Sequence, residues 1–227
     1  GGDDNANAGA LVLTDAHLIC LPVRSLYGTF AYVTSPMVLE RLKRDLIAAG
    51  VLGIPPIPSV ISPALILTKG SKLITDSTKD RVYLEDLDLM VHNDNSEIDK
   101  WAKYIANAVF PNDTSWETIF FERFTIISDD TFNFLTEIGT EIAARVRIDD
   151  DRKTVAKGAL WYEESLPAET ILAGLAWSDR VYSGEVTTRT AEIMLAALWL
   201  SGGLKLQLGG KATVGKGQVR CMFNGGA

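Results

Sequence analysis

Apolar and polar residues alternate most regularly near the C-terminal end of the chain. Residues 204–208 are apolar at every second position, and residues 218–223 form a second short, largely apolar run. Such alternation is typical of half-buried β-strands. The segment between them, 209–217, is rich in glycine. The pattern therefore predicts two strands joined by a glycine-rich loop, whose backbone N–H groups can approach a phosphate closely.

A second alternating segment spans residues 137–164. Residues 142–149 alternate along the first strand, residues 150–153 form a charged turn, and residues 154–163 form the returning strand. This pattern predicts a β-hairpin that carries arginines and two neighbouring aromatic residues. Aromatic surface beside cations is how proteins hold single-stranded nucleic acid. A two-sided edge hairpin with a charged face explains the same composition equally well.

Helical periodicity alternates with short apolar strands in the rest of the chain, which predicts an α+β fold. The clearest helix begins after Ser35 as its N-cap, has Pro36 in its first turn and ends at Gly50. The proline-rich segment 53–63 predicts an irregular connection. Further helices are predicted over 97–110, 115–123, 131–135 and 187–200, and further strands over 10–23 (bent near Asp15), 29–34, 65–67, 81–84 and 125–127.

The length of 227 residues allows one large domain or two small ones. The two cysteines, Cys20 and Cys221, are far apart and form no C-x-x-C pair. This predicts buried, reduced thiols in a cytoplasmic protein, and neither a zinc ribbon nor a disulfide framework. No apolar run approaches the roughly 20 residues of a membrane-spanning helix, so we expect no membrane partner.

Charge is distributed unevenly along the chain. The net charge of −7 disfavours a freestanding nucleic-acid-binding domain. However, residues 85–151 hold sixteen acidic and five basic residues, whereas residues 199–227 hold four basic residues and no acidic one. A phosphate backbone responds to local charge more than to the total. The glycine-rich loop therefore remains a favourable place for a polyanion.

Residues 210–216 also match the G-x-x-x-x-G-K pattern of a nucleotide-binding P-loop. Two features disfavour that function. Gly217 stands where the pattern needs Ser or Thr to bind magnesium, and the predicted loop leads into a strand instead of a helix N-terminus. A glycine-rich hairpin without any ligand remains the simpler alternative.

The sequence shows no spacing typical of a metal site. His17 lies in a predicted strand and His92 in a polar loop, and neither is spaced as a metal ligand. Residues 149–151 are three consecutive aspartates, but no EF-hand spacing follows them. An acidic hairpin turn is the simpler explanation, and we predict no metal bound by a motif of this chain.

Three ordered motifs resemble a known family. They are residues 8–18 with 22–36, the hairpin strands 145–149 and 158–164 followed by Leu166 and Pro167, and the glycine-rich tail loop. Together they resemble the backbone subunit of type III-B CRISPR effector (Cmr) complexes, in the RAMP superfamily, over nearly the whole chain. The glycine-rich loop alone would not be specific.

The resemblance implies a ferredoxin-like, RRM-related core with insertions. Residues 1–227 would form a single RAMP domain, with a helical insertion at about 94–136 and a thumb hairpin at about 137–165. Several copies would line a CRISPR RNA beside other Cmr subunits, and the thumb would insert between guide and target RNA. The implied function is a CRISPR RNA-binding backbone subunit that positions complementary target RNA for cutting at regular intervals. A non-catalytic scaffold subunit of a ribonucleoprotein filament is the alternative.

Cleavage in this family uses a divalent metal, with Mg²⁺ expected, and an aspartate in the loop after the first strand. Family members carry that strand, its loop and a helix before the segment that begins at Gly1. The catalytic aspartate therefore has no matching position, and we expect RNA binding without cleavage by this polypeptide alone. Glu163 is a candidate for a position near the scissile phosphate.

The resemblance assigns RNA binding to three groups of residues. Arg24 and Ser25, on the turn after a strand, are candidate phosphate contacts. The thumb group consists of Arg145, Arg147, Trp161 and Tyr162. The loop group would contact the guide backbone through amides and an ammonium group, and consists of Gly209, Gly210, Gly215, Lys216 and Gly217.

Overall fold

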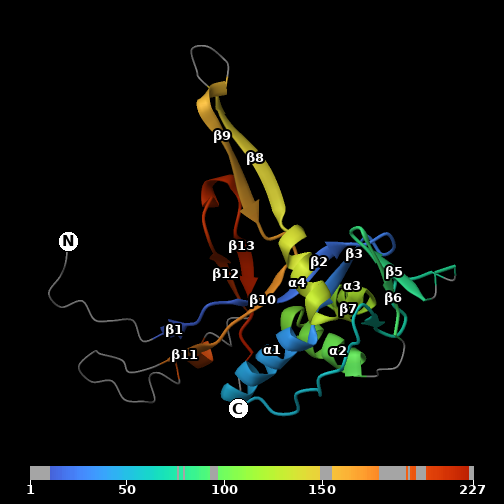
Figure 1. Cartoon of the computed structure of the whole chain (residues 1–227). Helices are drawn as coiled ribbons and strands as arrows, with labels where there is room; N and C mark the ends of the chain where they lie inside the picture. Colours follow the sequence, from blue (N-terminus) through green and yellow to red (C-terminus); the bar gives the residue numbers. More distant parts are fainter. Residues whose placement is uncertain are drawn as a thin grey trace.

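The computed structural model describes residues 11–75, 77–78, 80–92, 97–148, 155–178, 193, 195–197 and 203–224. A five-stranded sheet with the order β10-β2-β3-β7-β4 lies at the centre, surrounded by helices and two-stranded ribbons (Figure 1). Helices and strands are interspersed along the chain, which confirms the predicted α+β fold at this level.

The central sheet is mixed. β2 (His17–Arg24) pairs antiparallel with β3 (Phe30–Thr34), and β3 pairs parallel with β7 (Phe124–Ile127). β4 (Leu65–Leu67) and β10 (Ile171–Ala173) form the two edges, antiparallel to β7 and β2 respectively. A parallel pair needs a long crossover connection, and here that connection contains the first three helices.

The first helix begins where the sequence predicts. α1 (Pro36–Ala48) has Ser35 as its N-cap, and the Ser35 hydroxyl accepts a hydrogen bond from the Val38 N–H at 3.5 Å. Pro36 occupies the first turn, where its missing N–H costs no hydrogen bond. The cap and the proline together fix the start of the helix directly after β3.

Two of the remaining helices begin at side-chain caps as well. α2 (Glu97–Val109) is followed by α3 (Thr114–Arg123), which Asp113 caps. α4 (Asp129–Ile138) is longer than the predicted 131–135, because Ser128 caps it and two aspartates follow in its first turn. Acidic side chains there are stabilised by the helix dipole.

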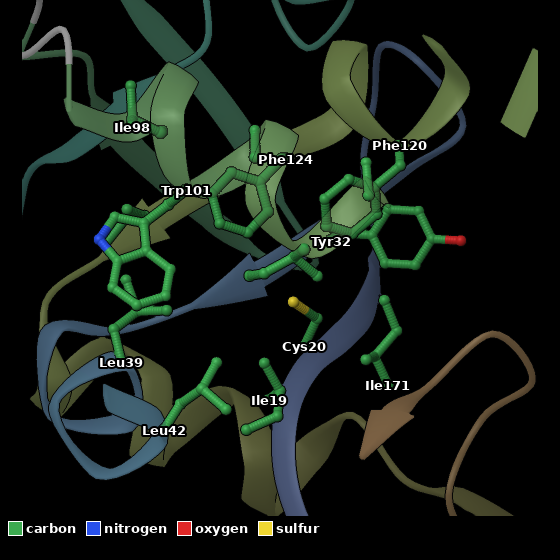
Figure 2. Packing of buried hydrophobic residues seen from close by; sticks show 14 of the residues in the cluster. Ile19, Cys20, Tyr32, Leu39, Leu42, Ile98, Trp101, Phe120, Phe124 and Ile171 are labelled. Atoms are coloured by element: carbon green, nitrogen blue, oxygen red, sulfur yellow. The ribbon is translucent and has the colours of Figure 1, made fainter. Parts of the chain in front are cut away.

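One face of the sheet packs against α1, α2 and α3. Trp101 of α2, Phe120 of α3 and Tyr32 of β3 are fully buried and lie in one cluster (Figure 2). The ring centroids of Tyr32 and Phe120 are 4.7 Å apart. The Trp101 indole N–H donates to the Pro56 carbonyl at 2.8 Å, so the proline-rich connection is tied to α2. Large aromatic side chains in such contacts dominate the energetics of a core.

The opposite face of the sheet is also buried. It packs against α4 and against the ribbon formed by β5 (Arg81–Leu84) and β6 (Leu87–Met90). Leu21 of β2, Val82 of β5 and Leu135 of α4 belong to this second cluster. A sheet covered on both faces needs apolar residues at successive positions. This explains why its central strands are continuous apolar runs and do not alternate.

Three further strand pairs lie outside the central sheet. They are β1 (Leu11–Leu13) with β11 (Ala176–Ser178), β8 (Glu141–Ile148) with β9 (Val155–Ser165), and β12 (Leu204–Gln207) with β13 (Gln218–Cys221). The β8–β9 hairpin projects from the body of the molecule, and the β12–β13 ribbon lies beside its base (Figure 1). Both pairs were predicted from alternation.

Some sequence predictions are corrected by the structure. The single strand predicted over 10–23 is two strands that join different sheets, β1 and β2. Cys20 is buried, and burial raises the pKa of its thiol, but Cys221 is only half-buried. The prediction of two buried thiols is therefore wrong for Cys221, which lies on the small β12–β13 ribbon. Both thiols are free.

Two predictions fall outside the described residues. They are most of the helix over 187–200 and the three aspartates at 149–151. Among the helices that the structure describes, none has the length and apolar character needed to cross a membrane.

Candidate nucleic-acid interface

The glycine-rich loop closes the β12–β13 ribbon. Gln207 faces Gln218 in the strand register, and the Leu208 N–H donates to the Gly217 carbonyl at 2.9 Å. Inside the loop, residues Ala212–Val214 form one 3₁₀ turn. Gly209, Lys211, Gly215 and Gly217 have φ between 64° and 79°, a left-handed conformation that glycine adopts most easily. The glycines therefore shape this loop directly.

Gly217 is required by its surroundings. A Cβ at this position would lie 1.9 Å from the Leu208 carbonyl oxygen, and φ is +72°. No other residue type fits there without displacing the backbone. Gly217 occupies the position where a P-loop has the Ser or Thr that binds magnesium, and here a glycine is needed there to close the ribbon. The loop also leads into β13 instead of a helix. Both observations count against the nucleotide-binding alternative.

The tip of the loop is open to a ligand. Residues 209–215 are exposed, and a Cβ at Gly209, Gly210 or Gly215 would meet no atom within 4 Å. A phosphate could therefore approach the backbone amides without steric hindrance. Successive N–H groups in turns that mix right- and left-handed residues form concave anion sites. The N–H groups of residues 214–216, however, already donate to loop carbonyls at 3.0–3.2 Å, so the amides open to a phosphate come before residue 214.

Both lysines of the loop contact the base of the β8–β9 hairpin. The Lys211 ammonium lies 2.7 Å from Glu163 Oε1. The Lys216 ammonium lies 3.0 Å from Glu141 Oε2 and 3.2 Å from Ser165 Oγ. Two segments that the sequence assigned separately to RNA binding are therefore brought together. Sequence reasoning missed the acidic partners, because the contacts join residues 48 or more positions apart along the chain.

Glu163 is the centre of these contacts. Besides Lys211, it accepts hydrogen bonds from the Trp161 indole N–H at 2.9 Å and from Arg145 Nε at 3.3 Å. The hydrogen bonds from Lys211, Trp161 and Arg145 lower its pKa to about 2. The side chain is therefore a carboxylate at neutral pH and has no proton to donate. Its predicted place near a scissile phosphate would juxtapose two negative charges.

The two aromatic residues of the hairpin lie on opposite faces. In the strand register, Arg145 faces Trp161, whereas Ala144 faces Tyr162. Trp161 therefore shares its face with a cation, as the binding of a stacked base requires. Tyr162 belongs to an exposed face with apolar neighbours, which include Ile142, Val146 and Leu160. The sequence analysis assigns both residues to one RNA-binding group, but side chains alternate along a strand, so neighbouring residues lie on opposite faces.

Arg24 and Ser25 form a separate group at the turn between β2 and β3. Arg24 Nε donates to Glu85 Oε2 at 2.8 Å, a second guanidinium nitrogen contacts the same oxygen, and the Arg24 backbone N–H donates to Glu85 Oε1 at 3.2 Å. The Ser25 hydroxyl is buried without a partner among the described residues. None of the described hydrogen bonds or ion pairs links this turn to the loop or to the hairpin. The structure thus brings together two of the three predicted groups.

Arg220 anchors the ribbon to the helical core. Its Nη2 donates to the Val109 carbonyl at 2.9 Å, and its guanidinium lies 5.8 Å from the centre of the Phe110 ring. Val109 is the last residue of α2, where a cation also stabilises the helix dipole. One of the basic residues that suggested polyanion binding therefore has a structural role.

The described residues contain no group of three or more His, Cys, Asp or Glu side chains that could hold a metal ion. His17 is half-buried in β2, and His92 is exposed after β6. The backbone N–H of His92 donates to the Leu65 carbonyl at 2.7 Å.

Comparison with known proteins places the chain in a family. Residues 1–220 match the RAMP superfamily. The chain is 36% identical over 214 residues to the CRISPR system Cmr endoribonuclease Cmr4 of Pyrococcus furiosus, which covers 94% of this chain and 68% of that protein. It is also similar to the crystal structure of oligomeric Cmr4 from the same organism, with a TM-score of 0.73 and 30% identity over 94% of this chain and 73% of that one.

A more distant similarity extends the fold comparison. A chain in the cryo-EM structure of the type III-B Cmr-beta complex bound to cognate target RNA has a TM-score of 0.68 and 20% identity, with 98% of this chain and 73% of that one covered. This likeness concerns the fold alone. The family match and the similarity to Cmr4 together show that the chain belongs to the RAMP superfamily and, within it, to the Cmr4 proteins of CRISPR systems.

Proposed function

We propose that the chain is a CRISPR RNA-binding backbone subunit of a type III-B effector complex, which holds the guide and positions complementary target RNA for cutting at regular intervals. One observation carries this proposal: an open, glycine-rich backbone loop lies against the base of a projecting hairpin that bears arginine and tryptophan. The loop can hold a ribose-phosphate backbone, and the hairpin can reach the bases beside it.

The assigned residues would contact different parts of the RNA according to their chemistry. In the loop, the amides of Gly209 and Gly210 would donate to phosphate oxygens, and Lys216 would supply charge. Gly215, whose N–H donates to the Ala212 carbonyl at 3.0 Å, would let the backbone turn and leave room for the phosphate. Gly217 supports binding by keeping the loop closed. On the hairpin, Arg145 and Arg147 would approach the backbone while Trp161 stacks on a base. Tyr162, which the sequence also assigned to RNA, lies on the opposite face and would meet a different surface.

Arg24 would contact phosphate at a second point. Ser25, which the sequence pairs with it, has a buried hydroxyl and an N–H that donates to the Thr29 carbonyl at 3.1 Å, so in this conformation it would shape the turn. The Arg24 side chain is 87% exposed although Glu85 holds it, so its guanidinium is accessible to a ligand. Because this turn is separate from the loop, a strand that touches both would follow an extended path. Extended single strands bound along their backbone are typical of RNA-binding subunits of this kind.

The proposed partners are a CRISPR RNA, target RNA, further copies of this chain and other Cmr subunits, in the cytoplasm. The related P. furiosus Cmr4 is described as oligomeric, and the Cmr-beta complex is described as bound to target RNA. We also propose a ferredoxin-like core. The adjacent parallel strands β3 and β7, joined through helices and flanked by antiparallel strands, are consistent with it.

Target cleavage would take place in the full assembly and would use a divalent metal, with Mg²⁺ as the best candidate. The related P. furiosus protein is named an endoribonuclease. A bound metal would stabilise charge at the scissile phosphate. Within the described residues, no cluster of His, Cys, Asp and Glu is suited to hold it. We propose that the residues of this part of the chain bind and orient RNA, and we assign none of them a catalytic role.

The scaffold alternative also has a specific observation in its favour. Both loop lysines are paired with glutamates, and one hairpin face is apolar and exposed. Such surfaces can contact protein neighbours. Ultraviolet crosslinking of the assembled complex separates the two functions. Crosslinks from RNA to the loop and to Trp161 would support RNA binding, whereas their absence would favour a scaffold.

A charge test addresses the same question with purified protein. Lys216→Ala should weaken RNA binding and reduce the dependence of affinity on salt, because one phosphate contact is lost. Gly217 is left unchanged in this test, because any side chain there would disturb the loop itself. An unchanged salt dependence in Lys216→Ala would count against the loop as a phosphate site.

A further inference from the structure

Each lysine of the glycine-rich loop already has an anionic partner in the RNA-free chain. Lys211 contacts Glu163 of β9 at 2.7 Å, and Lys216 contacts Glu141 of β8 at 3.0 Å. The two carboxylates come from the two strands of one hairpin, at its base. The loop that looks basic in the sequence is therefore close to neutral in its folded surroundings.

We propose that Glu141 and Glu163 are affinity-limiting residues, which compete with phosphate for Lys211 and Lys216 and must be displaced when a polyanion binds. This inference rests on the proposed function and deepens it, because it names what regulates the same loop. The competition means that the lysines alone give the loop little affinity for a stray polyanion. Binding then depends on a ligand that also satisfies the backbone amides.

The exposure of these ion pairs makes the exchange feasible. The lysine side chains are 55% and 40% exposed, so solvent reaches both pairs. Ion pairs in contact with water are weak and are screened by salt. A phosphate that also accepts hydrogen bonds from loop amides offers the lysine a better partner. The glutamates therefore reduce affinity without preventing binding.

Both glutamates remain satisfied after the lysines leave them. Glu163 keeps the Trp161 indole N–H and Arg145 as partners. Glu141 is 52% exposed and is hydrated when Lys216 moves away. Neither displacement leaves a buried, unpaired charge, which would be costly. The same exchange also releases the loop from the hairpin base, so RNA binding would alter how firmly the two segments are joined.

The chain offers a matched control. Glu164 follows Glu163 on β9 and accepts a hydrogen bond from the Thr140 hydroxyl at 2.7 Å, on the strand position that faces Ile142. Glu164→Gln changes the total charge by the same amount as Glu163→Gln. Among the described contacts it involves neither loop lysine. Any difference between the two variants therefore reports the lysine pairing and not the overall charge.

The experiment compares wild type, Glu141→Gln, Glu163→Gln, the double variant and Glu164→Gln. Binding is measured by fluorescence anisotropy over a range of salt concentrations, with a short unstructured single-stranded RNA and with inorganic polyphosphate. Each single variant should bind about threefold more tightly and the double variant about tenfold, consistent with the strength of exposed ion pairs. Their affinity should also depend more steeply on salt. Glu164→Gln should stay within about twofold of wild type.

Three outcomes would overturn the inference. Unchanged or weaker binding by Glu141→Gln and Glu163→Gln would mean that the glutamates position the lysines instead of competing for them. An equal gain in Glu164→Gln would mean a general charge effect, and binding of neither polyanion would remove the site. If wild type binds polyphosphate with the expected variant pattern but does not bind RNA, only the proposed function fails. Circular dichroism confirms that every variant is folded.

Discussion

The central sheet and the two outer ribbons are stabilised by different forces. The sheet is buried on both faces, and its buried polar residues are Ser and Thr, with no charged residue among those described. The β8–β9 and β12–β13 ribbons expose large apolar and aromatic side chains and contact each other through Lys–Glu pairs. Burial of apolar surface holds the first region, and charge contributes to holding the second.

This difference indicates how the chain separates stability from binding. Close-packed cores resist change, because a lost methylene group leaves a void that the surroundings fill only partly. Exposed ion pairs are weak and respond to salt and to competing ions. The ribbons can therefore exchange partners while the sheet stays intact. Substitutions in the two regions should consequently separate effects on folding from effects on RNA affinity.

The largest expected effect is on stability, in the core. Trp101→Ala removes a fully buried indole together with its hydrogen bond to the Pro56 carbonyl. We expect the free energy of unfolding to fall by about 3–5 kcal/mol, measured by chemical denaturation. Trp161→Ala is the control with the same residue type, since Trp161 is 42% exposed on the hairpin. Equal destabilisation by both variants would disprove the division between the two regions.

The second prediction concerns two glycines of one loop. Gly217→Ala places a Cβ against the Leu208 carbonyl at a left-handed φ, so the loop must distort and RNA affinity should fall tenfold or more, since such conformations cost about 1–2 kcal/mol before any clash. At Gly210 an added Cβ would contact no other atom, and the backbone φ is not left-handed. The Gly210→Ala variant should therefore be as stable as wild type. Thermal unfolding and RNA titration measure both quantities.

Gly210→Ala therefore acts as a probe of close approach. If a phosphate contacts the backbone there, the added methyl group weakens RNA binding while the unfolding temperature stays the same. An RNA affinity equal to that of wild type would show that no phosphate approaches this amide. The pair of variants thus separates the shape of the loop from its use.

The sequence predicted elements well and contacts poorly. Ser35 and Pro36 placed the start of α1, and alternation placed both ribbons, because these signals are local along the chain. β10 and β11 were missed, since each has three residues and exists only through pairing with a distant strand. The intrinsic strand propensity of a residue does not say which distant strand it will pair with.

The candidate site divides in the same way. The open loop glycines were predictable, because a backbone that needs positive φ selects glycine locally. The pairing of Lys211 and Lys216 with hairpin glutamates was not predictable, because charges far apart in sequence meet only in the folded chain. Arg220 shows the same limit: it looked like part of a basic patch, yet it stabilises the end of α2.

The third prediction compares the two faces of the hairpin. Trp161→Ala should weaken RNA binding by about 1–3 kcal/mol, the usual contribution of one stacked base. Tyr162→Ala should change RNA affinity much less, because Tyr162 shares its face with Ile142 and Leu160 and not with Arg145. Anisotropy titrations with single-stranded RNA measure both. A larger effect of Tyr162→Ala would assign RNA to the apolar face and reverse the proposed orientation.

The smallest expected effect is the response of the ribbon contact to pH. Lys211, followed by Trp161 and Arg145, lowers the pKa of Glu163 from 4.5 to about 2. Because the folded pKa lies below the unfolded value, the stabilising contribution of Glu163 is present in full above about pH 4.5 and is lost as the pH falls towards 2. Carboxyl NMR of Glu163 should therefore show little protonation at pH 4. In Lys211→Ala the pKa should rise towards its ordinary value, because the strongest donor is gone while Trp161 and Arg145 remain. A midpoint near 4.5 in wild type would mean that the loop is not held on the hairpin in solution.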